Sequence, residues 1–254
     1  MKSSTLRVIE DPKTHFIHLD PIPDKKTLAQ YYENYHHQLK EDFNPTREKQ
    51  RLKAIRKFVS SGRLLDIGAG RGFFVKTALK AGFQAEGVEI SQHACCYAQK
   101  KFKLKLHQGA FLDLKLTLGV YDVITLHSTL EHFPQPSQVL KKALTLLKPG
   151  GLLVFSVPNL DCFEYFLSQH TPYPYTGFIL EHLYYFNHSL VKKLLTDFQL
   201  KPLLITSRHY SPIEPLRLSP MLIGNLAKRI LEATDWGGRL GWGNVLYVYA
   251  QKNN

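Results

Sequence analysis

Short apolar runs alternate with amphipathic segments along the chain from about residue 62 to its end. Seven runs read as strands, and their residues are 63–68, 83–90, 103–109, 121–128, 151–159, 201–209 and 244–252. Apolar positions at helical spacing predict helices over 73–82, 91–102 with Ser91 as N-cap, 136–151 with a Pro-Gly-Gly stop, and 189–198. Strands that alternate with helices are typical of a parallel sheet covered by helices. The pattern therefore predicts an α/β fold with a doubly wound, mostly parallel, seven-stranded sheet.

Two segments depart from this alternation. The first 60 residues contain two predicted helices, at 25–40 and 46–59, before the sheet begins. Residues 160–187 are crowded with aromatic side chains and follow the fifth strand. We therefore expect an N-terminal helical lead-in (1–60) and one domain (61–254), in which 160–187 form an insert on the substrate side.

Composition narrows the class of protein. The chain has 254 residues, of which 44% are hydrophobic and 21% charged, as in ordinary globular proteins. Three cysteines cannot build a disulfide framework, and no His or Cys spacing predicts a zinc site. The start lacks a signal-peptide pattern, and no run approaches the ~20 apolar residues of a spanning helix. These features predict a cytoplasmic protein.

Charge raises a question about partners. Lys and Arg number 33 against 21 Asp and Glu, which gives a net charge of +12. A basic excess favours acidic partners such as nucleic acid, anionic lipid or anionic substrates, without choosing among them. The basic residues are scattered, however, so we expect solvated helix faces and no stable nucleic-acid partner. Length and composition leave monomer and homodimer open.

A glycine-rich loop follows the first strand of the sheet. The stretch LLDIGAGRGFF carries Asp66 and then Gly68, Gly70 and Gly72, and Glu89 ends the next strand. Ligands of doubly wound sheets bind where the strands end, and an acidic residue at the end of the second strand can accept hydrogen bonds from both ribose hydroxyls. Both a dinucleotide and another adenosine ligand fit these features.

Two details separate these ligands. A dinucleotide loop reads Gly-x-Gly-x-x-Gly, whereas here the third glycine comes one place early and Phe73 occupies its position. Asp66 would repel a pyrophosphate but suits a ligand with an ammonium group or a cationic centre. The ligand that fits is an adenosine without phosphates joined to an amino acid, which is S-adenosylmethionine.

These motifs also carry a family resemblance. LLDIGAGRGFF, GVEIS, YDVITLHSTLEHF and LLKPGGLLVFSVPN, in this order and spacing, resemble class I S-adenosylmethionine-dependent methyltransferases. The similarity runs from about residue 30 to the end and is greatest to the quinone-biosynthesis O-methyltransferase and small-molecule branch. It implies a methyltransferase (EC 2.1.1.-) that uses S-adenosylmethionine and releases S-adenosylhomocysteine.

Position by position, the resemblance implies a cofactor site. The glycines approach the methionine part and the ribose, and Glu89 holds the ribose hydroxyls. Asp66 organises either the loop or, through its neighbours, the ammonium group. The relatives often place an acidic residue where this chain has Ala110, so backbone groups at Ala110 and Phe111 take over the adenine contact. The expected cofactor-binding residues are Asp66, Gly68, Ala69, Gly70, Gly72, Glu89, Ile90, Ala110, Phe111, His127 and Ser128.

The chemistry of the acceptor points to a histidine. The sulfonium already activates the methyl group, so the protein mainly has to align the acceptor and remove its proton. His132 in STLEHF is the expected base, and a structural role for it stays open. In quinone-type relatives a second carboxylate joins this Glu-His pair, in clusters linked to a metal ion. That position is Ser128 here, so we predict no metal.

Aromatic residues are candidates for the acceptor's surroundings. Tyrosines with His182 in the insert can form an apolar wall with polar tips, and the N-terminal YYENY resembles segments that close over the cofactor. Core packing is the alternative for part of this set. The expected substrate-side residues are Tyr31, Tyr35, Tyr173, Tyr175, His182 and Tyr185.

One further amphipathic segment and two other classes of function stay open. The helix predicted over 219–236 combines apolar and basic residues, which allows peripheral membrane contact but favours packing within the protein. The favoured function is methylation of a small molecule, with oxygen as the acceptor atom. The alternatives are a methyltransferase acting on nucleic acid or protein, and a non-catalytic protein that binds S-adenosylmethionine.

Overall fold

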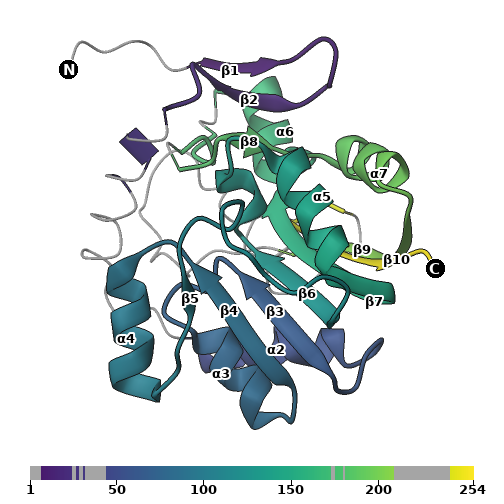
Figure 1. Ribbon diagram of the computed structural model, residues 1–254. Helices are drawn as coiled ribbons and strands as arrows, with labels where there is room; N and C mark the ends of the chain where they lie inside the picture. Colours follow the sequence, from purple (N-terminus) through teal and green to yellow (C-terminus); the bar gives the residue numbers. More distant parts are fainter. Residues whose placement is uncertain are drawn as a thin grey trace.

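A computed structural model of the chain describes residues 7–24, 27–28, 31, 44–172, 175–179, 181–208 and 241–254. Seven strands form its main sheet in the order β5-β4-β3-β6-β7-β10-β9 (Figure 1). Their bounds are β3 (Arg63–Ile67), β4 (Gln84–Glu89), β5 (His107–Gln108), β6 (Tyr121–His127), β7 (Leu147–Pro158), β9 (Leu200–Arg208) and β10 (Val245–Lys252). Strand β10 pairs antiparallel with both β7 and β9, and the pairs from β5 to β7 are parallel. The predicted α/β fold with a mostly parallel seven-stranded sheet is confirmed.

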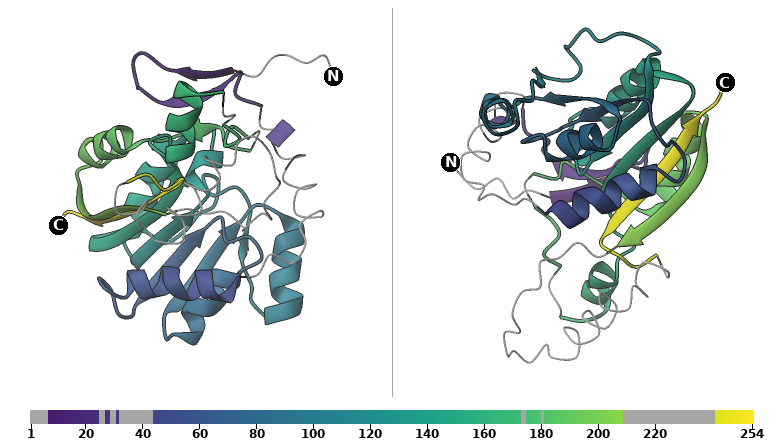
Figure 2. Two further views of the ribbon diagram at one scale, coloured as in Figure 1. Left: turned by 180° about the vertical axis from the view of Figure 1, so that it is seen from behind. Right: turned by 90° about the horizontal axis from the view of Figure 1, so that it is seen from below.

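Helices cover both faces of this sheet. Their bounds are α2 (Pro45–Ile55), α3 (Phe73–Lys80), α4 (Gln92–Phe102), α5 (Pro136–Leu146), α6 (Phe163–His170) and α7 (His188–Asp197). One buried cluster joins the sheet to α2, α3 and α4, and another joins it to α5 and α7. Figure 2 (left) shows α2 running across one face of the sheet. The helices α2, α3, α4, α5 and α7 bury apolar residues at helical spacing, which is why the amphipathic pattern located them. Helix α6, whose buried residue is Glu164, lies in the expected insert and was not predicted as a helix.

Local signals fix several helix ends. Ser91 accepts a hydrogen bond from the Ala94 N–H, as the predicted N-cap of α4. Asn187 does the same for α7 through the Leu190 N–H. No described helix is long and apolar enough to cross a bilayer.

Two predicted boundaries were wrong. Helix α5 ends at Leu146, and the Pro-Gly-Gly stretch lies inside β7 instead of stopping the helix. Leu147 already pairs with Tyr121, and the register shifts before Val123 meets Leu152, so the strand absorbs these residues through an irregularity. Strand β5 shrinks to His107–Gln108, because only this part of the predicted run pairs with β4.

The N-terminal segment also differs from the helical lead-in that the sequence suggested. Strands β1 (Arg7–Glu10) and β2 (Ile17–Asp20) form a hairpin, and β8 (Tyr184–Tyr185) from the insert adds to it. Asp11 closes the turn by accepting the Lys13 and Thr14 N–H groups. Short alternating strands carry a weak sequence signal, and the partner strand lies far along the chain. The small sheet lies above the large one in Figure 1.

Three strands end side by side at the place where the strand order reverses. Strands β4 and β6 flank β3, and their last residues are Glu89, His127 and Ile67 respectively. We call this place the carboxyl edge. Ligands of doubly wound sheets bind at such a reversal. The candidate cofactor residues of the three strands therefore lie together, as the sequence predicted from their positions.

Lys142 of α5 fastens the loop that follows β5. Its ammonium group donates to the carbonyl oxygens of Phe111, Leu112 and Leu114 at 2.6, 3.0 and 2.6 Å. Three carbonyls in one place are satisfied by one cation, and hydrogen bonds to charged groups are among the stronger ones. This contact holds the loop near the carboxyl edge in one conformation.

We predict that Lys142→Met lowers the unfolding temperature by several degrees, because three carbonyls lose their donor at a cost of about 1–3 kcal/mol. Lys141 is the neighbouring, exposed residue of the same helix. Lys141→Met is the matched control and should shift the transition by no more than about 1 °C. Scanning calorimetry of both variants checks this, and equal shifts would contradict it.

Candidate functional site

The loop after β3 is pressed against the segment that follows β6. A Cβ on Gly68, whose φ is +76°, would come within 2.4 Å of Thr129 Cγ2. A Cβ on Gly70, whose φ is +53°, would meet no atom within 4 Å. Gly68 is therefore demanded by packing within the protein, whereas Gly70 faces open space where a ligand can approach the backbone.

Glu89 connects this loop to the next strand-to-helix turn. Its two carboxylate oxygens accept the Gly70 N–H at 2.7 Å and the Ser91 N–H at 2.8 Å. Burial raises the pKa of Glu89, and these backbone hydrogen bonds oppose the rise. Because a carboxylate offers about four lone-pair sites, it can accept further donors such as sugar hydroxyls.

Apolar surface adjoins Glu89. Ile90, the next residue, leaves 47% of its surface exposed, and Ala69 lies buried in the glycine loop. The Phe111 side chain packs in the core, and its carbonyl is held by Lys142, while Ala110 is half-buried. Ile90 therefore offers an exposed apolar surface next to Glu89.

The Asp66 carboxyl group is buried and accepts a hydrogen bond from within the protein. It is 4% exposed, and Oδ1 accepts the Thr125 hydroxyl at 2.6 Å. Burial raises the pKa of Asp66 to about 7, while the Thr125 hydrogen bond and the Arg51 charge lower it. Asp66 therefore links β3 to β6 below the glycine loop.

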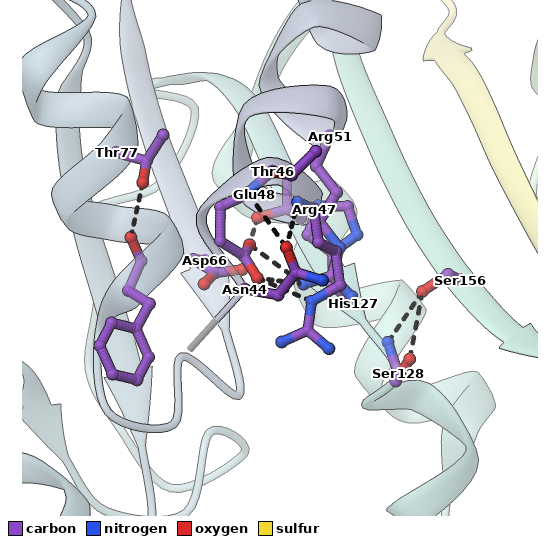
Figure 3. Close-up of polar contacts among 12 residues, drawn as sticks. Asn44, Thr46, Arg47, Glu48, Arg51, Asp66, Thr77, His127, Ser128 and Ser156 are labelled. Carbon is purple, nitrogen blue, oxygen red and sulfur yellow. Dashed lines mark hydrogen bonds and ion pairs between the residues drawn. The ribbon is translucent and has the colours of Figure 1, made fainter. Parts of the chain in front are cut away.

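A charged cluster from α2 lies beside Asp66, and the sequence reasoning missed it. Glu48 is 2% exposed and accepts Arg47 Nε at 2.9 Å and Arg51 Nη1 at 3.2 Å. The Arg51 Nε atom is buried with no hydrogen-bond partner among the described residues. Figure 3 shows both arginines and Glu48 gathered next to Asp66 and His127. Two cations therefore face the carboxyl groups of Glu48 and Asp66 in this place.

The start of α2 explains how these arginines reach the carboxyl edge. Asn44 caps the helix by accepting the Thr46 and Arg47 N–H groups, and Pro45 occupies its first turn. Residues 47 and 51 lie one turn apart, so both point the same way. The cap and the spacing are visible in the sequence, but the burial of the pair is not.

His127 and Ser128 follow at the end of β6. His127 is buried, its two ring nitrogens have no hydrogen-bond partner in the described part of the chain, and its ring meets the edge of Phe74. Burial and the charges of Arg51 and Arg47 hold the pKa of His127 well below its usual range, so the ring is neutral. The Ser128 N–H donates to Ser156 Oγ at 2.9 Å. His127 is therefore a neutral, buried polar group at the end of β6.

Three titratable side chains, Glu131, His132 and His182, lie close together after the end of β6. Glu131 is 1% exposed, and its Oε1 lies 4.0 Å from Nε2 of both His132 and His182. The His132 Nδ1 lies 2.6 Å from the Glu181 carbonyl, to which it donates. Burial raises the pKa of Glu131 to about 8 and lowers that of His182 to about 3. Sequence reasoning placed His132 and His182 in separate roles, since 49 residues lie between them.

The other residues expected on the substrate side differ in how deeply they are buried. Tyr185 is fully buried, and its hydroxyl donates to the Ile179 carbonyl, so it belongs to the core under the insert. Tyr175 is half-buried and packs edge-on against Tyr165. Tyr31 has helical backbone conformation and is half-buried. Tyr35 and Tyr173 lie outside the described residues, as does the helix predicted over 219–236.

The chain is similar to known methyltransferases. The family model for a methyltransferase domain matches residues 35–205. A ubiquinone biosynthesis O-methyltransferase of Burkholderia thailandensis is 30% identical over 115 residues, which are 42% of this chain and 48% of that protein. The matched segment thus spans about half the length of this curated relative.

Solved structures share the fold. A SAM-dependent methyltransferase from Archaeoglobus fulgidus superposes with a TM-score of 0.57 at 17% identity, covering 90% of this chain and 100% of that one. Phosphoethanolamine N-methyltransferase 2 of Haemonchus contortus, in complex with S-adenosyl-L-methionine, gives a TM-score of 0.53 at 15% identity, with 81% and 53% covered. With the family match over more than half of its residues, the chain belongs to the methyltransferase-domain family and is a class I S-adenosylmethionine-dependent methyltransferase.

Proposed function

We propose that this enzyme transfers the methyl group to an oxygen atom of a small molecule. The observation that carries the proposal is the recessed position of its polar groups. Glu131 is 1% exposed, and the His132 and His182 side chains are only 24% and 20% exposed. A compact acceptor can reach such groups more readily than a folded macromolecule can. The names of the relatives, ubiquinone biosynthesis O-methyltransferase and phosphoethanolamine N-methyltransferase, support a small acceptor.

The cofactor pose that we propose follows the charges along the carboxyl edge. The ribose hydroxyls donate to Glu89, and the adenine lies on Ile90 near the backbone of 110–111. The methionine part passes Gly70, and its carboxylate pairs with Arg51, whose buried Nε has no partner among the described residues. The ammonium group lies on the side of Asp66. This pose places the carboxylate and the ammonium group of the ligand beside groups of opposite charge.

The reaction then needs little from the protein beyond alignment. The acceptor oxygen attacks the methyl carbon in line, the new C–O bond forms, and the C–S bond breaks to leave S-adenosylhomocysteine. The acceptor's proton has to leave, and the group of Glu131, His132 and His182 is where we expect it to be handled. The Nδ1 atom of His132 donates to the Glu181 carbonyl, which orients the ring of the expected base within this group.

Methylation of nucleic acid or protein is the second candidate. The net charge of +12 favours it, because a basic surface attracts polyanions. The recessed position of the three titratable groups argues against it. Binding without catalysis is the remaining alternative.

To identify the acceptor, the protein is incubated with methyl-labelled S-adenosylmethionine and a cell extract divided into small-molecule, nucleic-acid and protein fractions. We expect label in the small-molecule fraction, at an oxygen that mass spectrometry locates. A Glu89→Ala protein in the same reactions controls for background label. Label in RNA or protein alone would refute the small-molecule proposal.

Glu89→Ala should weaken S-adenosylhomocysteine binding about 100-fold or more, since two hydrogen bonds to a charged group disappear together with the fastening of the loop. Glu86 of the same strand pairs with Arg63 and His107, away from the loop. Glu86→Ala is the control and should leave the affinity within about threefold. Calorimetric titration measures both variants.

Arg51→Met should lower the affinity for S-adenosylhomocysteine about 10- to 100-fold and leave 5′-methylthioadenosine, which lacks the amino-acid part, unchanged. Lys53, an exposed residue of the same helix, supplies the control Lys53→Met. An equal loss for both ligands would show that Arg51 supports the fold of the site instead of contacting the carboxylate.

A further inference from the structure

We propose that Lys142 of α5 is a positioning residue for the cofactor. By holding the loop after β5, it aims backbone N–H groups of that loop at the adenine and so sets the selectivity for this base. The inference deepens the proposed function and rests on the cofactor pose given there, in which the adenine lies near the backbone of 110–111. Lys142 contacts no ligand atom in that pose and acts through the loop.

Residues 110–113 form a turn whose carbonyl groups gather at one cation. The Asp113 N–H closes the turn by donating to the Ala110 carbonyl at 2.9 Å. Phe111 and Leu112 are the central residues, and their carbonyl oxygens accept from Lys142 Nζ at 2.6 and 3.0 Å. One side of the turn is therefore occupied by carbonyl groups that point to the ammonium group.

The planarity of the peptide bond fixes where the N–H groups of this turn point. In a trans peptide the carbonyl of one residue and the N–H of the next point in opposite directions. Because the Phe111 carbonyl points to Lys142, the Leu112 N–H points away from Lys142. The Ala110 carbonyl is turned toward Asp113 inside the turn, so the Phe111 N–H points out of it. These two donors suit an acceptor atom, and the N1 atom of adenine is such an atom.

The start of the same loop is tied to the residue that we assign to the sugar. The Gly109 N–H donates to the Glu89 carbonyl at 2.9 Å, while the Glu89 carboxylate accepts from the Gly70 and Ser91 N–H groups. Lys142 holds the far end of the loop, so the loop is fastened at both ends. A base that is joined to a ribose at Glu89 therefore meets the turn at a fixed distance.

The ammonium group of Lys142 is needed for this arrangement. Its Nζ atom lies 5.0 Å from the centre of the buried Phe111 ring, so the cation is held between α5 and the loop. Burial lowers the pKa of Lys142, and the charge of Asp113 opposes this change. A side chain without N–H donors would release the carbonyls. The N–H groups would then turn with them, because each carbonyl shares a rigid plane with the following N–H.

Calorimetric titration of the full chain with two ligands tests the inference. S-Adenosylhomocysteine carries the acceptor N1, whereas its 1-deaza analogue has a C–H group there and keeps the 6-amino group. We expect the unaltered chain to bind S-adenosylhomocysteine about 10-fold more tightly than the analogue, since one hydrogen bond is worth about that factor. Lys142→Met should reduce this preference to about threefold or less. Lys142→Arg, which keeps a cation with several N–H donors, should retain most of it.

Two controls separate the positioning role from a purely structural one. Lys141→Met, at the exposed neighbour in α5, should keep the full preference. A purely structural role of Lys142 would weaken both ligands by the same factor and leave the preference unchanged. Circular dichroism at the titration temperature shows whether each variant is folded. If Lys142→Met does not fold, Lys142→Gln takes its place, and a reduced preference is expected there too.

Equal affinity of the unaltered chain for the two ligands, or an unchanged preference in Lys142→Met, would overturn the inference. Glu89→Ala is measured in the same titrations. Weakened binding in Glu89→Ala with an unchanged preference in Lys142→Met refutes this inference and supports the cofactor pose. Label in RNA or protein alone, in the methylation experiment above, refutes the proposed acceptor without altering the result for Lys142.

Discussion

The site depends first on one carboxylate that accepts from two strand-to-helix turns. Glu89 takes the Gly70 N–H from the loop after β3 and the Ser91 N–H at the start of α4. Gly68 presses the same loop onto Thr129 after β6. The ends of three strands are thereby fixed to one another before any ligand arrives. Such preorganisation means that binding does not have to order the loop, which would otherwise reduce the affinity.

Buried charged and titratable side chains lie next to one another along the carboxyl edge. Glu48 neutralises part of the Arg47 and Arg51 charge, and Asp66 and a neutral His127 lie beside them. Glu131 and two histidines follow farther along the same edge. A zwitterionic ligand with a cationic sulfur requires both signs of charge within a short distance, and this edge of the sheet provides them. The helix that carries the arginines precedes the sheet in sequence, yet it brings them next to Asp66 and His127.

What the sequence could predict follows from the range of the interactions. The glycine loop, Glu89 and the Ser91 cap depend on residues within a few positions, so pattern and spacing located them. The burial of Arg51 and the contact of His182 with Glu131 depend on segments far along the chain, so the sequence named His182 without predicting this contact. Tyr185 proved to be a core residue for the same reason. The hairpin of β1 and β2 pairs with β8 more than 160 residues later, and no local pattern announces such a partner. The Pro-Gly-Gly stretch shows that strand pairing can override a strong local stop signal.

The most direct test of the account is a crystal structure of the protein with S-adenosylhomocysteine. The account predicts both ribose hydroxyls within hydrogen-bond distance of Glu89 and the homocysteine carboxylate at Arg51, with the chain around Gly70 little changed. A nucleoside bound in the opposite direction, or at another edge of the sheet, would contradict it.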